Sequence, residues 1–193
     1  MTTASAFPVY AFTLFCVLAT ACEPRTGQAV DSAASPPATP EPPPADTWTV
    51  DAQGIGRVRT GITVAALGEA LGATITPVYD FNPSCTHVTP AGLPPGVSLM
   101  IVDDTVARIE VTAGEVRTSE GTGIGDAESA VVALYAGRVE VQPHKYTGPE
   151  GHYVVVTPPG DTLHRIIFET DGQKVLRYRA GRVPAVQYVE GCA

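Results

Sequence analysis

The sequence is poor in basic residues. Its 193 residues contain 12 Lys and Arg against 20 Asp and Glu, which gives a formal net charge of −8. A protein that binds nucleic acid needs a basic patch to neutralise phosphate groups. The acidic composition therefore predicts that nucleic acid is not a partner.

Motifs for catalysis and metal binding are also lacking. The histidines His87, His144, His152 and His164 form no H-x-H or H-x-x-x-H pair, so the spacing typical of a zinc site is absent. No Gly-x-Ser-x-Gly elbow is present, and the glycines of 121–125 form neither a Walker loop nor a dinucleotide-binding loop. The sequence alone thus predicts no catalytic residue, no metal site and no cofactor.

Long hydrophobic runs are scarce. The apolar run over 7–19 has the length of the central part of a signal peptide and is too short to span a bilayer. Small residues at Ala19 and Ala21 make an A-x-A cleavage site, and Cys22 directly after it makes a lipobox. We expect a signal peptide over 1–21 and a lipidated Cys22. The alternative is a secreted protein without lipid, because no Lys or Arg precedes the run and Ala19 replaces the Leu most common in lipoboxes.

Cysteine is scarce as well, with four in the chain. Cys16 would leave with the signal peptide, so the mature chain would keep Cys22, Cys85 and Cys192. An odd number of cysteines is unfavourable in an oxidising compartment. If Cys22 carries the lipid, Cys85 and Cys192 can form a disulfide; the alternative is two buried free thiols.

Proline is concentrated in one stretch, because seven of the 18 prolines lie between Pro24 and Pro44. Such a composition cannot bury a core and favours extended polyproline II conformations. We therefore expect the lipidated Cys22 and a disordered tether over 22–46, followed by a single domain over 47–193. The lipid would make the membrane one partner of the protein.

Glu23 follows the expected lipidated residue. In Gram-negative lipoproteins, which this segment resembles, Asp at that place signals retention in the inner membrane. Glu23 leaves sorting to the outer membrane open. We expect a membrane-anchored lipoprotein on the periplasmic side of a bacterial envelope, in the outer membrane rather than the inner one.

The domain contains an internal similarity. The tripeptide Val-Arg-Thr at 58–60 recurs at 116–118, and further segments align at slowly increasing shifts. We expect a duplication with repeat units over about 58–113 and 116–181. The alternative is a single fold without repetition.

Each unit begins with a helical pattern. Apolar residues spaced by three and four predict helices over 63–71 and 126–134, with Thr63 and Asp126 as N-caps. A helix followed by an antiparallel meander, twice, predicts an α+β domain. The expected fold is a tandem α-β-meander repeat whose helices pack on one face of an antiparallel sheet.

Two hairpins complete the expected meanders. The strands 97–102 and 106–111 flank Asp103-Asp104-Thr105, and the strands 166–170 and 174–179 flank Asp171-Gly172. Further strands are expected over 152–157 and at Tyr188-Val189.

Several short segments of the domain are distinctive. They are Gly54-Ile55-Gly56, Gly61-Ile62-Thr63, Leu71-Gly72, Gly123-Ile124-Gly125-Asp126, Leu134-Tyr135 and Tyr188-Val189-Glu190-Gly191-Cys192. Through these segments the chain resembles a set of uncharacterised exported proteins of proteobacteria over most of Val50–Cys192. More distantly, its "Gly-Ile-Thr…Leu-Gly" helix is similar to the β-lactamase-inhibitor-like fold, which also occurs in the small lipoprotein of the outer-membrane assembly machinery. The first resemblance implies no activity; the second, a fold-level analogy, implies protein binding through a sheet.

Aromatic and histidine residues gather in the aligned segments 79–88 and 146–155. Tyrosine is favoured at interfaces because it offers a large contact area and a polar tip. These residues are therefore the candidate interaction face, although half of them could instead pack the sheet. They are Tyr79, His87, Tyr146, His152 and Tyr153.

We expect the domain to be a non-catalytic module that binds another envelope protein. The alternative is an envelope hydrolase or carbohydrate-binding domain whose site forms only in three dimensions. An enzyme should show a pocket with a perturbed carboxylate or histidine, and a binding module an exposed apolar and aromatic patch.

Overall fold

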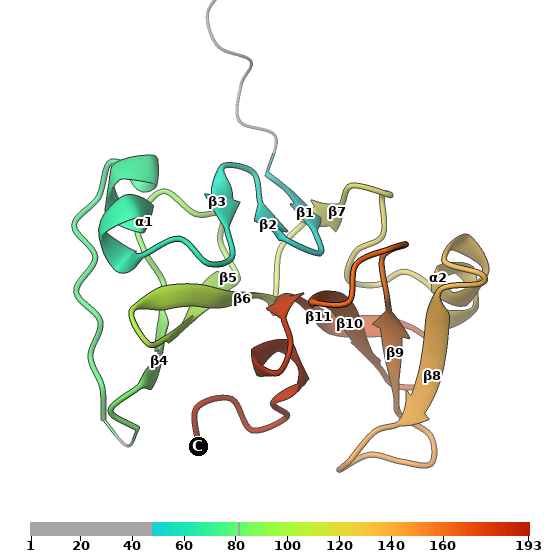
Figure 1. The fold of residues 1–193 in the computed structure, drawn as a ribbon. Helices are drawn as coiled ribbons and strands as arrows, with labels where there is room; N and C mark the ends of the chain where they lie inside the picture. The colour runs from blue at the N-terminus through green and yellow to red at the C-terminus, as the bar shows by residue number, and fades with distance from the viewer. Residues whose placement is uncertain (1–47, 81) are drawn as a thin grey trace, which may run out of the picture. The chain divides into compact units, whose positions relative to one another are not determined.

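The computed structural model describes residues 48–80 and 82–193 (Figure 1). The expected signal peptide over 1–21, the lipidated Cys22 and the tether over 22–46 lie outside the described residues. They stay predictions.

The described chain is mostly β-structure. Strands account for 39% of it and helices for 12%, and the strands form sheets of seven and four. The expected α+β fold, with helices packed on one face of a sheet, is therefore wrong. The sequence patterns marked both helices, but they did not reveal the smaller sheet, whose two- and three-residue strands are too short for a periodic signal.

The larger sheet is antiparallel throughout, and β6 meets β11 at its centre (Figure 1). A helix precedes the strands on each side of that centre, in the order α1-β4-β5-β6 and α2-β8-β9-β10-β11. The duplication of the sequence stays a prediction. In spatial order the strands are β4 (Cys85–Val88), β5 (Val97–Val102), β6 (Thr105–Val111), β11 (Val175–Arg182), β10 (His164–Thr170), β9 (His152–Val156) and β8 (Val139–Pro143).

Both predicted hairpins are confirmed. Asp103 and Asp104 have φ angles of 47° and 59° between β5 and β6, as a two-residue turn with positive φ at both positions requires. Between β10 and β11, Asp171 Oδ1 accepts the N–H groups of Gln173 and Lys174, which closes the second turn.

The smaller sheet lies above the larger one in Figure 1. In spatial order its strands are β3 (Val58–Arg59), β2 (Gly54–Ile55), β1 (Thr49–Asp51) and β7 (Arg117–Thr118). Strands β1 and β7 are far apart in sequence but pair in parallel.

Two short helices flank the sheets. For α1 (Val64–Leu71), Thr63 Oγ1 accepts the N–H of Ala66, so the predicted N-cap is confirmed. For α2 (Glu128–Leu134), Asp126 as N-cap is wrong, because Ala127 holds that position without a side-chain hydrogen bond. The Asp126 carboxylate instead accepts the Gly123 N–H and pairs with Arg117.

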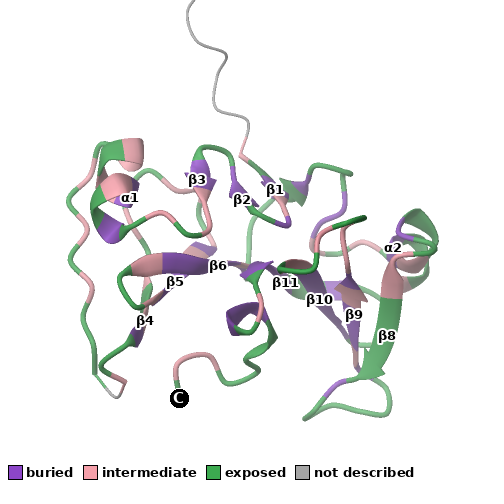
Figure 2. Cartoon of the chain, viewed as in Figure 1, coloured by how far each residue is buried: buried purple, intermediate pink, exposed green. Residues whose placement is uncertain are grey.

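The main core fills the space between the two sheets. Val50 and Ile55 of the smaller sheet are fully buried and belong to one cluster with Leu67 of α1 and with Ile109 and Phe168 of the larger sheet. Figure 2 shows buried residues on the strands that face one another there. This packing leaves one face of the larger sheet for other contacts, and it is the face that carries most of the charged side chains.

The chain ends beneath that second face (Figure 1). After β11 comes a short 3-10 helix, η1 (Ala185–Gln187), and then irregular structure to Ala193. The strand expected at Tyr188-Val189 does not form. We call residues 183–193 the C-terminal segment.

Candidate functional site

Charged side chains from the central strands share the second face of the larger sheet. Successive residues of a strand point to opposite faces. Tyr178 and Phe168 point into the main core, so their neighbours point the other way. These neighbours are Glu169 on β10 and Arg177 and Arg179 on β11, joined from β6 by Arg108 and Glu110.

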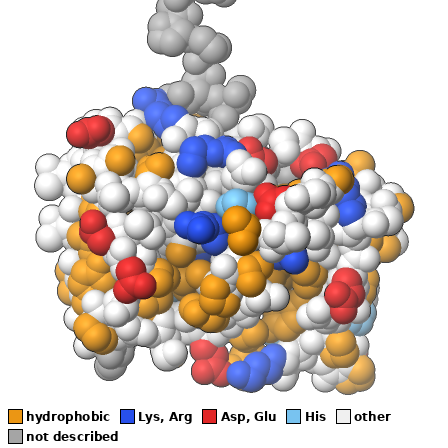
Figure 3. Space-filling model, viewed as in Figure 1, with side chains coloured by type: hydrophobic (Ala, Val, Ile, Leu, Met, Phe, Trp, Pro, Cys, Tyr) orange, Lys and Arg blue, Asp and Glu red, His pale blue; other side chains and the backbone are white. Residues whose placement is uncertain are grey.

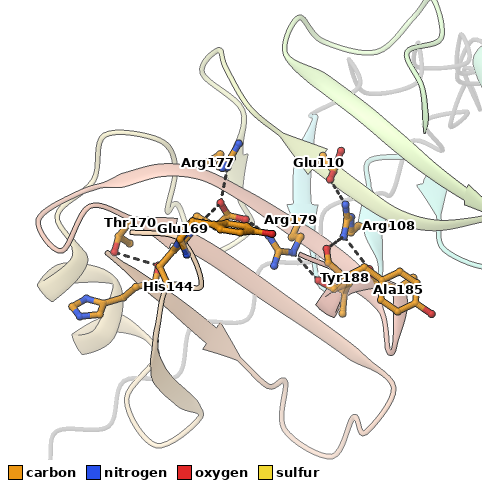
Figure 4. Close-up of polar contacts among 12 residues, drawn as sticks. Arg108, Glu110, His144, Glu169, Thr170, Arg177, Arg179, Ala185 and Tyr188 are labelled. Carbon is orange, nitrogen blue, oxygen red and sulfur yellow. Dashed lines mark hydrogen bonds and ion pairs between the residues drawn. The ribbon is translucent and has the colours of Figure 1, made fainter. Parts of the chain in front are cut away.

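Glu169 is the centre of this charged cluster (Figure 4). Its carboxylate is 6% exposed and accepts hydrogen bonds from Arg177 Nε, at 2.6 Å, and from Arg179 Nη1. His144 Nε2 lies 3.4 Å from the same carboxylate. Burial would raise the pKa of Glu169, but the hydrogen bond from Arg177 and the charges of Arg179 and Arg177 outweigh it and hold the pKa below its usual value.

Two arginines of the cluster hold the C-terminal segment. Arg108, only 2% exposed, donates from Nη1 to the carbonyl oxygens of Ala185, at 3.0 Å, and Tyr188, at 2.7 Å. Arg179 donates from Nε to the carbonyl oxygen of Val186 at 2.7 Å. The charged face of the sheet thus binds a piece of its own chain through backbone carbonyls.

A disulfide and an apolar contact fix the same segment. Cys192 is bonded to Cys85 of β4, so the predicted disulfide is confirmed. Val186 is fully buried against Tyr153 of β9 and Ile167 of β10. The C-terminal segment is therefore anchored at both ends.

The anchored segment forms one wall of a cavity of about 640 Å³, which we call the C-terminal groove. Ser84, Val102 and Lys145 contribute to the other walls. The residues of the C-terminal segment that line it are Tyr188, Val189, Glu190, Gly191, Cys192 and Ala193.

Exposed apolar side chains border the groove. Tyr188 is 42% exposed and Val189 is 36% exposed. Tyr146 is 62% exposed, and its hydroxyl donates to the carboxylate of Glu190, which also accepts from Lys145 Nζ at 2.7 Å. Figure 3 shows hydrophobic side chains gathering on the lower half of the face it draws, where Figure 1 places the C-terminal segment.

The five residues of the expected interaction face do not form one surface. Tyr146 borders the groove, and Tyr79 is exposed in the segment before β4. His87 of β4 lies near the C-terminal segment, with Nε2 3.4 Å from Glu110. Tyr153 is buried against the C-terminal segment. His152 lies on the opposite face of β9, where Nδ1 is 3.0 Å from the carboxylate of Glu128.

A second polar arrangement lies on the side of the smaller sheet. His164 Nδ1 is 2.8 Å from Asp161 Oδ2, and His164 Nε2 is 3.2 Å from Thr60 Oγ1. This chain of three side chains could not be predicted from the sequence, because Thr60 and His164 are 104 residues apart. No sequence motif links them.

Asp161 is held as a carboxylate. Burial would raise its pKa, but hydrogen bonds from the Leu163 N–H, the His164 imidazole and the His164 N–H lower the pKa to about 2. The carboxylate is therefore ionised at neutral pH and accepts the proton on His164 Nδ1.

Across residues 48–80 and 82–193, no group of three or more His, Cys, Asp or Glu side chains is arranged to hold a metal ion. Within the same ranges, no helix is long and apolar enough to cross a membrane.

Comparisons with protein-family models, curated proteins and solved structures find no match for this chain. The resemblances to exported proteobacterial proteins and to the β-lactamase-inhibitor-like fold stay predictions.

Proposed function

We propose that this protein is a bacterial envelope lipoprotein whose domain binds another envelope protein at the C-terminal groove. The observation that carries the proposal is the exposure of Tyr146, Tyr188 and Val189 beside one cavity. Tyrosine rings supply contact area with little loss of conformational entropy, and such residues are enriched in the energetic centres of interfaces.

The anchoring of the groove supports this proposal. Arg108 and Arg179 hold three carbonyls of the C-terminal segment, and Cys192 is bonded to Cys85. A wall fixed before binding loses little further freedom when a partner docks, so more of the contact energy appears as affinity.

The test is capture of partners from the intact envelope of the native host. Full-length protein is crosslinked in cells, purified and analysed by mass spectrometry. Because Ala193 lines the groove, the affinity tag is inserted within 23–46 and not placed at the C-terminus. The variant carries Tyr146→Ala and Tyr188→Ala, and the matched control carries Leu134→Ala, an exposed apolar residue on α2.

One dominant protein partner, kept by the Leu134→Ala control and lost by the double variant, is the expected result. The double variant keeps the backbone carbonyl of residue 188 that Arg108 binds, so it should fold. Absence of any partner, or equal capture by all three proteins, would contradict the proposal.

A further inference from the structure

We propose that Thr60, His164 and Asp161 form a nucleophile, base and acid site that hydrolyses small carboxylic esters through an acyl-threonine intermediate. The site lies on the side of the smaller sheet, away from the C-terminal groove. It is therefore an activity in addition to the proposed binding function, and the two can be tested separately.

The hydrogen bonds have the direction that nucleophilic catalysis needs. The ionised Asp161 carboxylate accepts the proton on His164 Nδ1, so the lone pair of the neutral imidazole is at Nε2. That nitrogen faces Thr60 Oγ1 at 3.2 Å and can accept the hydroxyl proton. The same order of acid, imidazole and hydroxyl activates the nucleophile of unrelated hydrolase folds.

Backbone hydrogen bonds fix the Asp161 carboxylate and the backbone of Thr60. Asp161 Oδ1 accepts the N–H groups of Leu163 at 2.8 Å and His164 at 3.0 Å. The N–H of Thr60 donates to the carbonyl of Gln53 at 2.8 Å. A site fixed before substrate arrives avoids the cost of ordering its groups during the reaction.

An arginine lies close to Thr60 and His164. Arg182 is paired with His164 across β10 and β11, so both side chains are on the same face of the sheet. A Cβ built on Gly61, the residue after Thr60, would lie 3.4 Å from Arg182 Nη1. Within the described residues, Arg182 has no hydrogen bond or ion pair from its side chain, so its charge is available to an oxyanion.

A cavity of about 270 Å³ lies beside the Asp161 end of the site. Asp161 lines it, together with Gln53, whose carbonyl binds the Thr60 N–H, and Ile166, which is two residues from His164; Thr60 and His164 themselves do not line it. Its walls combine polar groups, from Gln53, Glu120 and Arg138, with the apolar side chains of Val156 and Ile166. A cavity of this size admits only a small group, so the substrate class is a small carboxylic ester.

The reaction balances with water as the co-reactant. Thr60 Oγ1 attacks the ester carbonyl carbon while its proton passes to His164 Nε2, and the oxyanion forms beside Arg182. Collapse breaks the ester C–O bond, and the leaving alcohol takes the proton from Nε2. Water then attacks the acyl-threonine with His164 as base, which releases the carboxylic acid and restores the hydroxyl.

The test uses the full mature protein with two probes, 4-nitrophenyl acetate for turnover and a fluorophosphonate for covalent labelling. Thr60→Val keeps the shape of the side chain without the hydroxyl, and His164→Gln removes the base. We expect each to lower kcat/KM by about 10²-fold or more, and Thr60→Ser to retain activity. Mass spectrometry should find the fluorophosphonate on Thr60.

His152→Gln is the matched control, because His152 is also paired with a carboxylate, Glu128, but within residues 48–80 and 82–193 its Nε2 has no hydroxyl partner. It should leave turnover unchanged. Turnover by wild type no greater than that of Thr60→Val, or labelling at another residue, would overturn the proposal. Circular dichroism of each variant shows that loss of activity is not loss of fold, and partner capture at the groove is unaffected by either outcome.

Discussion

Glu169 has two opposing effects on the stability of the domain. Burial of its carboxylate destabilises the fold, because removing a charge from water costs free energy. Its contacts with Arg177, Arg179 and His144 offset that cost. Once the cluster exists, loss of the carboxylate leaves Arg179 buried without its closest counter-charge. The sensitivity of the domain to substitution should therefore be concentrated here and not at the exposed ion pairs.

Glu169→Gln should lower the free energy of unfolding by about 3 kcal/mol, because it breaks a buried pair from one side. Arg117→Gln is the control, since the Arg117–Asp126 pair is half-exposed and screened by solvent, so its loss should change the free energy of unfolding far less. Urea unfolding at neutral pH measures both. An equal loss of unfolding free energy in the two variants would show that the buried cluster contributes no more to stability than an exposed ion pair.

Asp161 should make stability depend on acid pH. Its folded pKa of about 2 lies below the ordinary 3.8, so the stability it contributes is complete above the ordinary value and lost as pH falls toward the folded one. The gap in unfolding free energy between wild type and Asp161→Asn should shrink as pH is lowered from about 5 to about 2. Urea titrations at several pH values measure it; a constant gap would contradict the lowered pKa.

At the scale of elements, the C-terminal segment joins strands that are otherwise distant. It connects β4 through Cys192, β6 through Arg108, and β9 and β10 through Val186. The only regular structure within 183–193 is the single turn of η1, so the segment cannot hold its own conformation. Its order therefore depends on its contacts with the sheet, which are the disulfide, the two arginines and Val186.

The disulfide should contribute strongly to unfolding free energy. Cys85 and Cys192 are 107 residues apart, and closing a loop of that size contributes about 4–5 kcal/mol in the chain-entropy model. The paired change Cys85→Ser and Cys192→Ser should lose most of that amount, and hydrogen exchange should rise first in residues 183–193. Reduced wild type serves as the control. Protection of 183–193 equal to that of the oxidised protein would show that the arginines suffice.

Features with a local sequence signal could be predicted. Thr63 before an apolar helical pattern, Asp103-Asp104 between two apolar runs and an odd cysteine count each pointed to a feature that the structure has. Features that depend on residues far apart in sequence could not. The parallel pairing of β1 with β7 and the contact of Thr60 with His164 join segments with no mutual pattern, so the fold class and the second polar site could not be predicted.

The five residues of the candidate interaction face are divided between two faces of the sheet for a simpler reason. His152 and Tyr153 are adjacent on a strand, so they point to opposite faces of the sheet. Their residue types placed both in the candidate interaction face, but the alternation of side chains along β9 puts them on opposite sides of the sheet. Of the five residues, Tyr146 is the one that borders the C-terminal groove.

At the scale of the whole molecule, the larger sheet separates two surfaces. The ester site lies with the smaller sheet on one side, and the C-terminal groove lies on the other. Variants of one surface should therefore leave the other unchanged, because residues far apart without shared partners act independently.

Anchoring by lipid is a further prediction for the whole chain. Cys22→Ser should move the protein from the membrane fraction to the soluble envelope fraction and abolish incorporation of labelled palmitate. Cys16→Ser is the control, because Cys16 lies within the expected signal peptide. Membrane association and labelling that persist in Cys22→Ser would show that Cys22 is not the lipidated residue.

The central claim, that the C-terminal groove binds another envelope protein, is tested most directly by site-specific photocrosslinking in living cells. A photoreactive amino acid is placed at Val189 beside the groove or, as the control, at Leu134 on α2, both exposed apolar positions. The account predicts one discrete crosslinked protein from position 189 and none from 134. Crosslinks of equal yield from both positions, or none from 189, would contradict it.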